Sequence, residues 1–378
     1  MQRVDLACFP TPYFLVDEAR LRRNLSRLKE VSDRTGCRIL LAQKAFSMYS
    51  VYPIMREYLA GSTASGLYEA RLGHEHFGGE THVFSPAYRE EEFEQILQFA
   101  NHLVFNSPAQ LRRYALRAKA AGKSVGLRIN PEHSTQEGHA IYDPCAPGSR
   151  LGTTLSNFDE SLLPLLDGLH FHTLCEQNSD DLEATAKAFE ERFGKYLHQL
   201  HWLNFGGGHH ITRPDYDIPR LISVIEHFRD RYDVQIYLEP GEATVYHAGF
   251  LVSSVLETMH NGMEIAILDT SAACHMPDVL EMPYRPPLKD SGEAGEKAYT
   301  YRLSSCTCLA GDVIGDYSFD REIRIGDKLY FMDMAIYSMV KNNTFNGMPL
   351  PDIAVMHEDG ECEVIRHFGY EDFKSRLS

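Results

Sequence analysis

Several polar residues and one glycine turn follow short apolar runs of the sequence, each at the point where a run ends. These positions are Lys44, Ser65, Asn106, Arg128, His172, the Gly206-Gly207-Gly208 turn and Glu239. They offer an amine, a guanidinium, an imidazole, a carboxylate and a row of unobstructed backbone amides. Strand interiors are seldom this polar, so we expect these residues to share one site.

Lys44 ends the run RILLAQK and is the residue with the most distinctive chemistry. In a site that excludes water the ammonium form of lysine is disfavoured, and a neutral amine can form a Schiff base with an aldehyde. Taken alone, a lysine at a strand end is more often a solvated surface residue. The other members of the set decide between these interpretations.

Three further features suit separate parts of a pyridoxal phosphate molecule. The amides of Gly206–Gly208 could hold a phosphate, because no side chain obstructs them. Glu239 could keep a pyridine nitrogen protonated, and His172 could lie flat against the ring. Each feature also has an ordinary explanation, as a tight turn, a strand-end acid or a core histidine. Their common position at strand ends favours the joint interpretation.

Strand-like and helical segments alternate between residues 38 and 239, a pattern typical of parallel βαβ units. The eight strand-like runs are 38–44, 61–65, 81–85, 102–106, 124–130, 168–174, 201–205 and 235–239. Eight such strands predict a (β/α)₈ TIM-type barrel, with an open doubly wound sheet as the alternative. Barrel enzymes carry their active sites at the carboxyl ends of the strands, where the polar set falls.

Beyond Pro240 the strand-like segments have no long helices between them. They are 244–256, 263–269, 299–305, 328–334 and 353–366. We therefore predict two domains, a barrel over residues 12–245 and an all-β C-terminal domain over residues 246–378, with residues 1–11 packing on the second.

Composition limits the possible partners. The formal charge is −16, and from Glu239 onward 23 acidic residues face 11 basic ones, so nucleic acid is not expected as a partner. The acidic part could instead favour a cationic ligand. No apolar run is long enough to span a membrane. Eight scattered cysteines without a CxxC pair and a start without a signal pattern predict reduced thiols in the cytoplasm.

The motifs around these residues resemble those of the fold-type III pyridoxal-phosphate decarboxylases and alanine racemase. They are AQKAFS at Lys44, GLRIN at Arg128, HFHTLCEQ at His172, NFGGGHHIT at Gly206–Gly208 and EPGE at Glu239. The resemblance covers nearly the whole chain and implies pyridoxal 5'-phosphate as cofactor, with no metal. It also implies a homodimer with shared active sites.

Two later segments add to the resemblance. CTCLAGDVIGDY resembles a cysteine-containing loop that enters the partner subunit's site, which would make Cys308 catalytic. FMDMAIYSM resembles a segment whose tyrosine, here Tyr337, touches the cofactor phosphate. After loss of carbon dioxide, Cys308 or Lys44 would return the proton.

Within the group, HTLCEQ, GGGHHITR and EPGEA most closely resemble carboxynorspermidine/carboxyspermidine decarboxylases. Ornithine-type enzymes have an arginine two residues after the proline of EPG, where this chain has Glu242. A carboxylate there suits a long substrate with extra amines. Asp278, in a loop that the family places near the substrate tail, is the second candidate for binding an amine. Because the two substrates differ by one methylene, the sequence does not separate them.

Other functions remain as alternatives. The nearest is a related decarboxylase acting on diaminopimelate, ornithine or arginine, although the second carboxylate of diaminopimelate should attract arginine rather than Glu242. A more remote one is a metal-dependent hydrolase on a barrel, using the pair His170 and His172 with His74, His76, His209 or His210. A regulator without activity is disfavoured, because Lys44 and Glu239 are both present.

Overall fold

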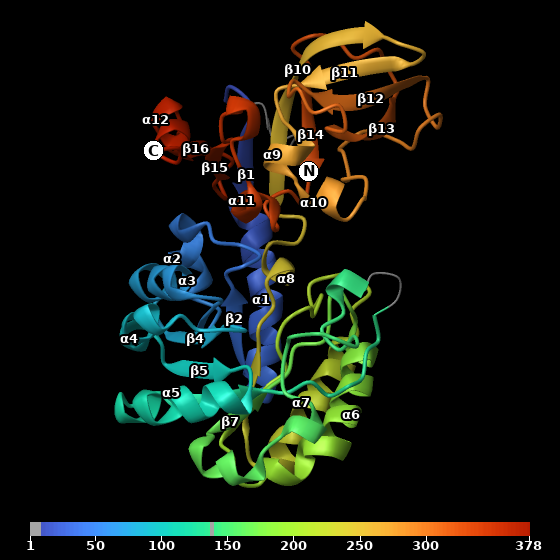
Figure 1. Cartoon of the computed structure of the whole chain (residues 1–378). Helices are drawn as coiled ribbons and strands as arrows, with labels where there is room; N and C mark the ends of the chain where they lie inside the picture. The colour runs from blue at the N-terminus through green and yellow to red at the C-terminus, as the bar shows by residue number, and fades with distance from the viewer. Residues whose placement is uncertain (1–8, 137–139) are drawn as a thin grey trace. The chain divides into compact units, whose positions relative to one another are not determined.

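Eight parallel strands close into a barrel in the computed structural model of this chain, which describes residues 9–136 and 140–378 (Figure 1). The barrel strands are β2 (Arg38–Ala42), β3 (Gly61–Ala64), β4 (Glu80–Phe84), β5 (His102–Phe105), β6 (Ser124–Arg128), β7 (Gly168–His170), β8 (Trp202–Asn204) and β9 (Gln235–Leu238). Strand β9 pairs with β2 and closes the sheet. The predicted barrel is therefore confirmed, and the doubly wound alternative is wrong.

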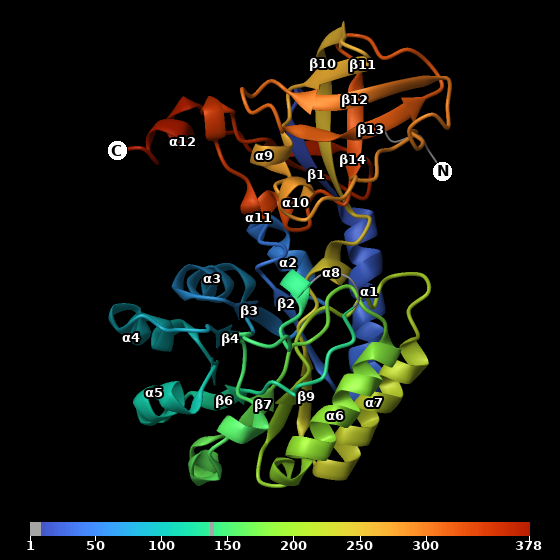
Figure 2. The same cartoon turned by 45° about the vertical axis from the view of Figure 1, so that its right-hand side comes forward.

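Helices follow most of the strands, as in other βα barrels. They are α1 (Glu18–Thr35), α2 (Tyr52–Met55), α3 (Leu67–Leu72), α4 (Glu90–Phe99), α5 (Pro108–Ala120), α6 (Ser179–Leu197), α7 (Ile218–Tyr232) and α8 (Glu242–Val245). Helices α6 and α7 lie side by side (Figure 2). Local sequence sets their starts: the Ser107 hydroxyl caps α5, and the Asp217 carboxylate caps α7.

Alternate residues of the strands fill the barrel interior. The indole of Trp202 lies against Gly126 of β6 and Gly168 of β7, where an added Cβ would come within 2.3 Å and 2.0 Å of the ring. Any larger residue at either glycine would displace the indole. Residues two positions further along these strands face the interior one level nearer the carboxyl ends, because side chains alternate along a strand.

The second unit is built on an eight-stranded sheet with the order β13-β12-β11-β10-β1-β15-β16, in which β14 also pairs with β10. Its strands are β1 (Tyr13–Asp17), β10 (Gly249–His260), β11 (Glu264–Leu268), β12 (Tyr299–Ser305), β13 (Val313–Phe319), β14 (Lys328–Met332), β15 (Asp352–Met356) and β16 (Cys362–Arg366). Its helices are α9 (Ala272–His275), α10 (Asp278–Glu281), α11 (Ser338–Lys341) and α12 (Tyr370–Lys374).

The boundary of this unit differs from the predicted one. We expected the barrel to begin at residue 12, but chain contacts assign the residues up to Leu21 and those from Val245 onward to the β unit. The run YFLVD followed by an amphipathic helix has the local pattern of a first βα unit. Both edges of β1, however, are occupied by β10 and β15. Local pattern cannot reveal such distant pairing partners.

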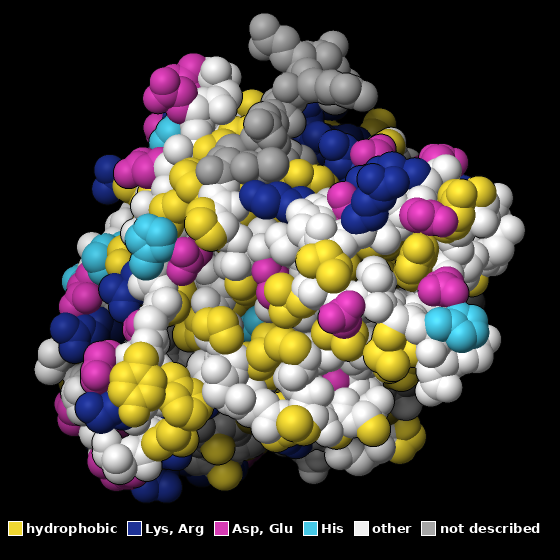
Figure 3. Space-filling view, turned by 90° about the horizontal axis from the view of Figure 1, so that it is seen from above, with side chains coloured by type: hydrophobic (Ala, Val, Ile, Leu, Met, Phe, Trp, Pro, Cys, Tyr) yellow, Lys and Arg dark blue, Asp and Glu magenta, His cyan; other side chains and the backbone are white. Residues whose placement is uncertain are grey.

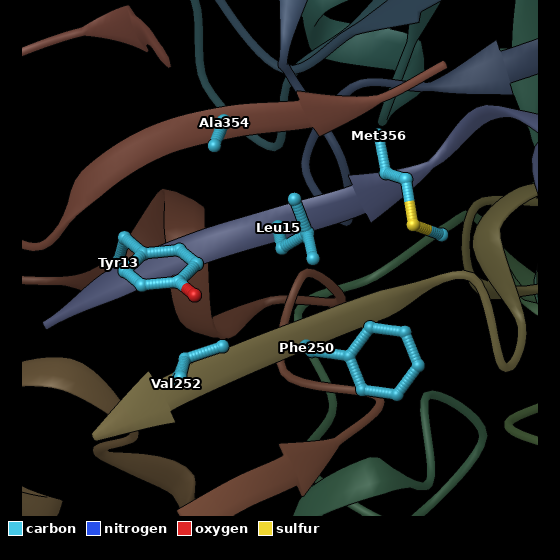
Figure 4. Close-up of a cluster of buried hydrophobic side chains, with 6 residues drawn as sticks. All are labelled: Tyr13, Leu15, Phe250, Val252, Ala354 and Met356. Atoms are coloured by element: carbon cyan, nitrogen blue, oxygen red, sulfur yellow. The ribbon is translucent and has the colours of Figure 1, made fainter. Parts of the chain in front are cut away.

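A buried apolar cluster holds β1 in place between its neighbours. It consists of Tyr13 and Leu15 of β1, Phe250 and Val252 of β10, and Ala354 and Met356 of β15 (Figure 4). Phe9 packs against the same cluster. Of the segment 1–11 that we expected to pack on this domain, residues 1–8 lie outside the described residues.

The surface carries both signs of charge. On the face shown in Figure 3, acidic, basic and apolar side chains are interspersed. Among the helices of residues 9–136 and 140–378, none combines the length and the apolar character that crossing a membrane requires.

Candidate active site

A layer of polar side chains lies inside the barrel near the carboxyl ends of its strands. Arg128, His170 and Asn204 are neighbours in the registers of β6, β7 and β8, so their side chains point to the same face. Glu239 directly follows β9, and Lys44 lies two residues beyond β2. The predicted barrel residues therefore gather at one end of the barrel.

Glu239 is a carboxylate held by two side chains of this layer. Asn204 Nδ2 donates to its Oε1 at 2.8 Å, and His170 Nε2 lies 3.4 Å from its Oε2. Burial opposes ionisation, but the proximity of His170 and these hydrogen bonds outweigh it and hold the pKa of Glu239 at about 2. Burial lowers the pKa of His170, and the charge of Glu239 opposes that shift. Glu239 is thus a buried carboxylate with two side-chain partners, Asn204 and His170.

Lys44 lies in a turn that the buried side chain of Gln43 anchors. Gln43 Nε2 donates to the carbonyl oxygen of Glu69 at 2.9 Å and to that of Thr63 at 3.3 Å. The hydroxyl of Tyr52 donates to Gln43 Oε1 at 3.2 Å. These bonds fix the backbone from which the Lys44 side chain extends.

The environment of Lys44 favours a reactive amine. Its side chain is exposed, so a ligand can reach it. Protein atoms nevertheless crowd the amine, and this desolvation lowers the pKa of Lys44, with a further lowering by the positive charge of Arg128. The charges of Glu239 and Glu242 oppose this shift without cancelling it. A lower pKa increases the population of the neutral amine, the form that attacks a carbonyl carbon.

The glycine turn closely approaches the neighbouring backbone. A Cβ at Gly206, Gly207 or Gly208 would lie 2.5, 2.5 or 2.0 Å from a carbonyl oxygen, and Gly206 and Gly208 have φ of +71° and +82°. Only glycine fits at these positions.

The amides of this turn are not equivalent. The N–H of Gly206 donates to Asn204 Oδ1 at 2.8 Å, and that of Gly207 donates to His172 Nδ1 at 3.0 Å. The amides of Gly208 and His209 donate no hydrogen bond within the part of the chain that the structure describes. Of the predicted turn, Gly208 therefore has an amide without an acceptor among the described residues, and His209 directly after it has a second.

His172 and Arg128 form one connected pair beside this turn. Because His172 Nδ1 accepts from Gly207, its proton lies on Nε2, and burial together with the charges of Lys44 and Arg128 lowers the pKa of His172 well below its usual value. Arg128 Nη2 donates to the carbonyl of His172 at 3.0 Å, and its guanidinium lies over the ring of Phe84. Burial lowers the pKa of Arg128 to about 10, which leaves it charged at pH 7.

Asn204 is the residue of this site that sequence reasoning missed. It is fully buried, and its amide group joins the glycine turn to Glu239 by the two bonds given above. The signal was an uncharged polar side chain at the end of the apolar run HWLNF, directly before the turn. We had treated it as part of a strand.

Glu242, the first residue of α8, belongs to a small polar cluster. His210 Nε2 lies 2.7 Å from its Oε2, and one carboxylate oxygen of Glu176 lies within 4.8 Å of both groups. The negative charge of Glu242 acts on Lys44, so the cluster is near the reactive amine. Two carboxylates in this position create a region that favours cations.

The remaining predicted residues belong to the β unit. Cys308 is exposed in the loop between β12 and β13, and its N–H donates to Asn346 Oδ1 at 2.8 Å. Asp278 begins α10 and pairs with Lys341 Nζ at 2.5 Å. Tyr337 precedes α11 with φ +55° and ψ −39°, a backbone conformation that is rare for a bulky residue.

The histidines proposed for a metal hydrolase are not brought together. His170 and His172 contact Glu239 and Gly207, respectively. His74 and His76 are exposed in the short π-helical segment Gly73–Phe77, which follows α3. Among the described residues, two groups could place ligands around a cation. They are Glu176, His210 and Glu242, and Glu80, His82 and His102 near the amino ends of β4 and β5.

The chain is similar to several known decarboxylases. The family model described as pyridoxal-dependent decarboxylase, C-terminal sheet domain, matches residues 16–335. A carboxynorspermidine/carboxyspermidine decarboxylase of Campylobacter jejuni is 42% identical over 97% of this chain and 98% of its own length. A carboxyaminopropylagmatine decarboxylase of Synechocystis is 41% identical over 100% of this chain and 98% of its own.

A solved structure shows the same similarity at the level of the fold. The carboxynorspermidine decarboxylase of Campylobacter jejuni, crystallised with norspermidine, superposes with a TM-score of 0.92 at 41% identity, over 97% of this chain and 100% of that one. Sequence, fold and barrel-end residues thus agree, and the chain belongs to the pyridoxal-dependent decarboxylases.

Proposed function

We propose that this chain decarboxylates carboxynorspermidine, carboxyspermidine or both, and releases norspermidine or spermidine in polyamine biosynthesis. The observation that carries this proposal is the joint placement of Lys44, the ionised Glu239 and the paired acids Glu176 and Glu242 at one end of the barrel. Relatives over 40% identical with full-length coverage act on carboxylated polyamine-type compounds, as their names state.

The barrel-end residues fit pyridoxal 5'-phosphate. A Cβ would fill the space at the glycine turn, and the amides of Gly208 and His209 lack acceptors within the described chain, as a phosphate site requires. Lys44 would bind the aldehyde carbon, Glu239 would face the ring nitrogen, and His172 would support the ring. When bound, the cofactor supplies an electron sink for the carbon that loses carbon dioxide.

Glu239 keeps its negative charge at any physiological pH, because its pKa is about 2. It can therefore hold a proton on a ring nitrogen throughout turnover. Arg128 fixes the backbone of His172, and Gly207 fixes the His172 ring. These contacts orient His172 within the site.

The proton that replaces carbon dioxide would come from Cys308 or Lys44. For Cys308, the S–H bond breaks as a C–H bond forms at the α-carbon, and the thiolate then regains a proton from water. We propose that Cys308 serves the site of a second subunit in a homodimer. We also propose that Tyr337 touches the cofactor phosphate. The strained backbone of Tyr337 supports a functional role.

Substrate amines would be bound by acidic side chains. Glu242, with Glu176 and His210, would receive the secondary ammonium that distinguishes polyamine precursors from ornithine or diaminopimelate. Asp278 would bind a more distant amine, but it already pairs with Lys341. An incoming ammonium therefore has to displace that lysine or share the Asp278 carboxylate with it.

The seven cysteines that the structure describes are free thiols, which supports a cytoplasmic location.

The function is tested by carbon dioxide release from a panel of substrates. We expect wild-type protein with pyridoxal phosphate to prefer carboxynorspermidine or carboxyspermidine over ornithine, arginine and diaminopimelate. Carboxyaminopropylagmatine belongs in the panel because one relative is named for it. A preference for it would move the proposal to a substrate with a guanidinium end, and release from none of the three carboxylated compounds would refute it.

The role of Lys44 is tested by Lys44→Ala. We expect the variant to lose the visible absorbance that marks a cofactor bound to lysine, and carbon dioxide release to fall by roughly three orders of magnitude. Lys187→Ala, an exposed lysine on α6, is the matched control. If Lys44→Ala kept the absorbance and the activity, the assignment would be wrong.

Asn204→Asp tests how Glu239 is held. The substitution keeps the shape and the acceptor for Gly206 but replaces a donor by a second carboxylate, which should raise the pKa of Glu239. We expect weaker binding of pyridoxal phosphate and a loss of about 1–3 kcal/mol in the free energy of unfolding, measured in urea. The exposed Asn157→Asp should change neither. Equal stabilities of Asn204→Asp and wild type would contradict this role.

Glu242→Gln tests the ammonium site with two ligands of matched length. Norspermidine has a secondary amine at its centre, where 1,7-diaminoheptane has a methylene. We expect the variant to bind norspermidine about tenfold more weakly, since a hydrogen bond to a charged group is worth roughly 1.5–3 kcal/mol, and 1,7-diaminoheptane almost unchanged. Calorimetry measures both, with Glu183→Gln on α6 as control. Equal weakening of both ligands would show a general charge effect instead.

A further inference from the structure

A buried carboxylate in the β unit, Asp312, collects hydrogen bonds from two separate segments. Its Oδ2 accepts from the hydroxyls of Ser271, Ser305 and Thr307, each at 2.6 Å, and its Oδ1 accepts from the N–H of Ala273 at 3.2 Å. Only 1% of Asp312 is exposed. Burial opposes its ionisation, but these donors outweigh burial and lower the pKa of Asp312.

The donors surround the loop that carries Cys308. Ser305 and Thr307 flank its first cysteine, and Asp312 closes the loop through its own N–H, which donates to the Leu309 carbonyl at 2.9 Å. On the opposite side, the Cys308 N–H donates to Asn346. The loop is thereby fixed at both of its ends and at the cysteine itself.

The same carboxylate also fixes the segment before Asp278. Ser271 caps α9, and Ala273 lies in its first turn. Asn343, which follows α11, donates from Nδ2 to the Ala273 carbonyl at 2.8 Å. Asp312 therefore joins the Cys308 loop to α9, and Asn343 in turn links α9 to the segment after α11.

This network lies at the end of the sheet pairing, where Ser305, the last residue of β12, still pairs with Leu268 of β11. In β12 and β13 the regular register ends at Leu303 and Gly315, and a shift follows before Ser304. Asp316, four residues after Asp312, supports the ladder itself through its pair with Arg302 at 2.8 Å. Asp312 acts beyond the regular ladder, at the loop.

We propose that Asp312 is a positioning residue that holds the Cys308 thiol in the orientation needed for proton return. The inference rests on the proposed role of Cys308 in decarboxylation. An anion suits this task because it accepts from all four donors, whereas an amide would present its own N–H groups to some of them. Loss of the charge should let the loop adopt several conformations.

The test compares Asp312→Asn and Thr307→Val with the control Asp316→Asn, all as holoenzymes. The first readout is the rate at which iodoacetamide alkylates Cys308, followed by peptide mass spectrometry. The second is the ratio of aldehyde to carbon dioxide. If the proton were added on the cofactor instead of at the α-carbon, water would release the product as an aldehyde and the amino group would stay on the cofactor. Thr307→Val keeps the test decisive if Asp312→Asn fails to fold.

We expect both variants to change the alkylation rate and to raise the aldehyde ratio by at least about fivefold. The affinity of both variants for norspermidine should stay within about twofold of wild type. The alkylation rate and the aldehyde ratio of the Asp316→Asn control should stay within the same limit. In a double-mutant cycle, adding Asp312→Asn to Cys308→Ala should have no further effect on the ratio, because Asp312 acts through Cys308.

Two results would overturn the inference: an unchanged alkylation rate and ratio, or full additivity with Cys308→Ala. A wild-type protein that releases no carbon dioxide from any substrate would instead refute the proposed function. The alkylation rate would then still decide whether Asp312 positions the loop.

Discussion

The site depends on one charge kept inside the barrel, the carboxylate of Glu239. Burying a charge is costly unless donors replace the lost water, and here Asn204 and His170 do so. The register of β7 with β8 fixes both donors at one level. Because Asn204 also holds Gly206, the same residue sets the distance between the anion and the glycine turn. The geometry of the site is therefore built into the barrel interior.

Sequence patterns predicted the barrel and most of its functional end, because strand ends and lysine, glutamate and glycine signals are local. They failed where the pairing partners of a strand are distant in sequence, and where the functional side chain is uncharged. Strand β1 looked like the start of the barrel, but its partners are residues 249–252 and 352–356. Asn204 looked like ordinary strand, and the start of β13 was taken as part of a cysteine-containing loop because of a resemblance. The amides of Gly206 and Gly207 are taken up by side-chain acceptors, which no spacing reveals.

The residues proposed for the cofactor and those proposed for the substrate differ in how tightly the structure holds them. Except for Tyr337, the groups proposed for the cofactor belong to the barrel unit, whereas Tyr337, Asp278 and Cys308 belong to the β unit. The barrel residues are held by short, buried bonds that tolerate little change. Glu242 and Asp278 are only partly buried, and they contact His210 and Lys341, respectively, so substitutions there alter charge at modest structural cost. Substrate preference can therefore diverge among relatives while the barrel chemistry stays the same.

The central place of β1 has a consequence for how the protein is made. During synthesis on the ribosome, β1 is made first and the barrel strands follow. Strands β10 and β15, which flank β1 in the finished sheet, are made only after the barrel. The barrel can close as soon as β9 emerges, since its strands pair with near neighbours and with β2. The β unit cannot form at that point, because its hydrophobic first strand pairs with β10 and β15, which are synthesised after β9. Contacts so distant in sequence form slowly, and an unpaired apolar strand is prone to aggregate meanwhile.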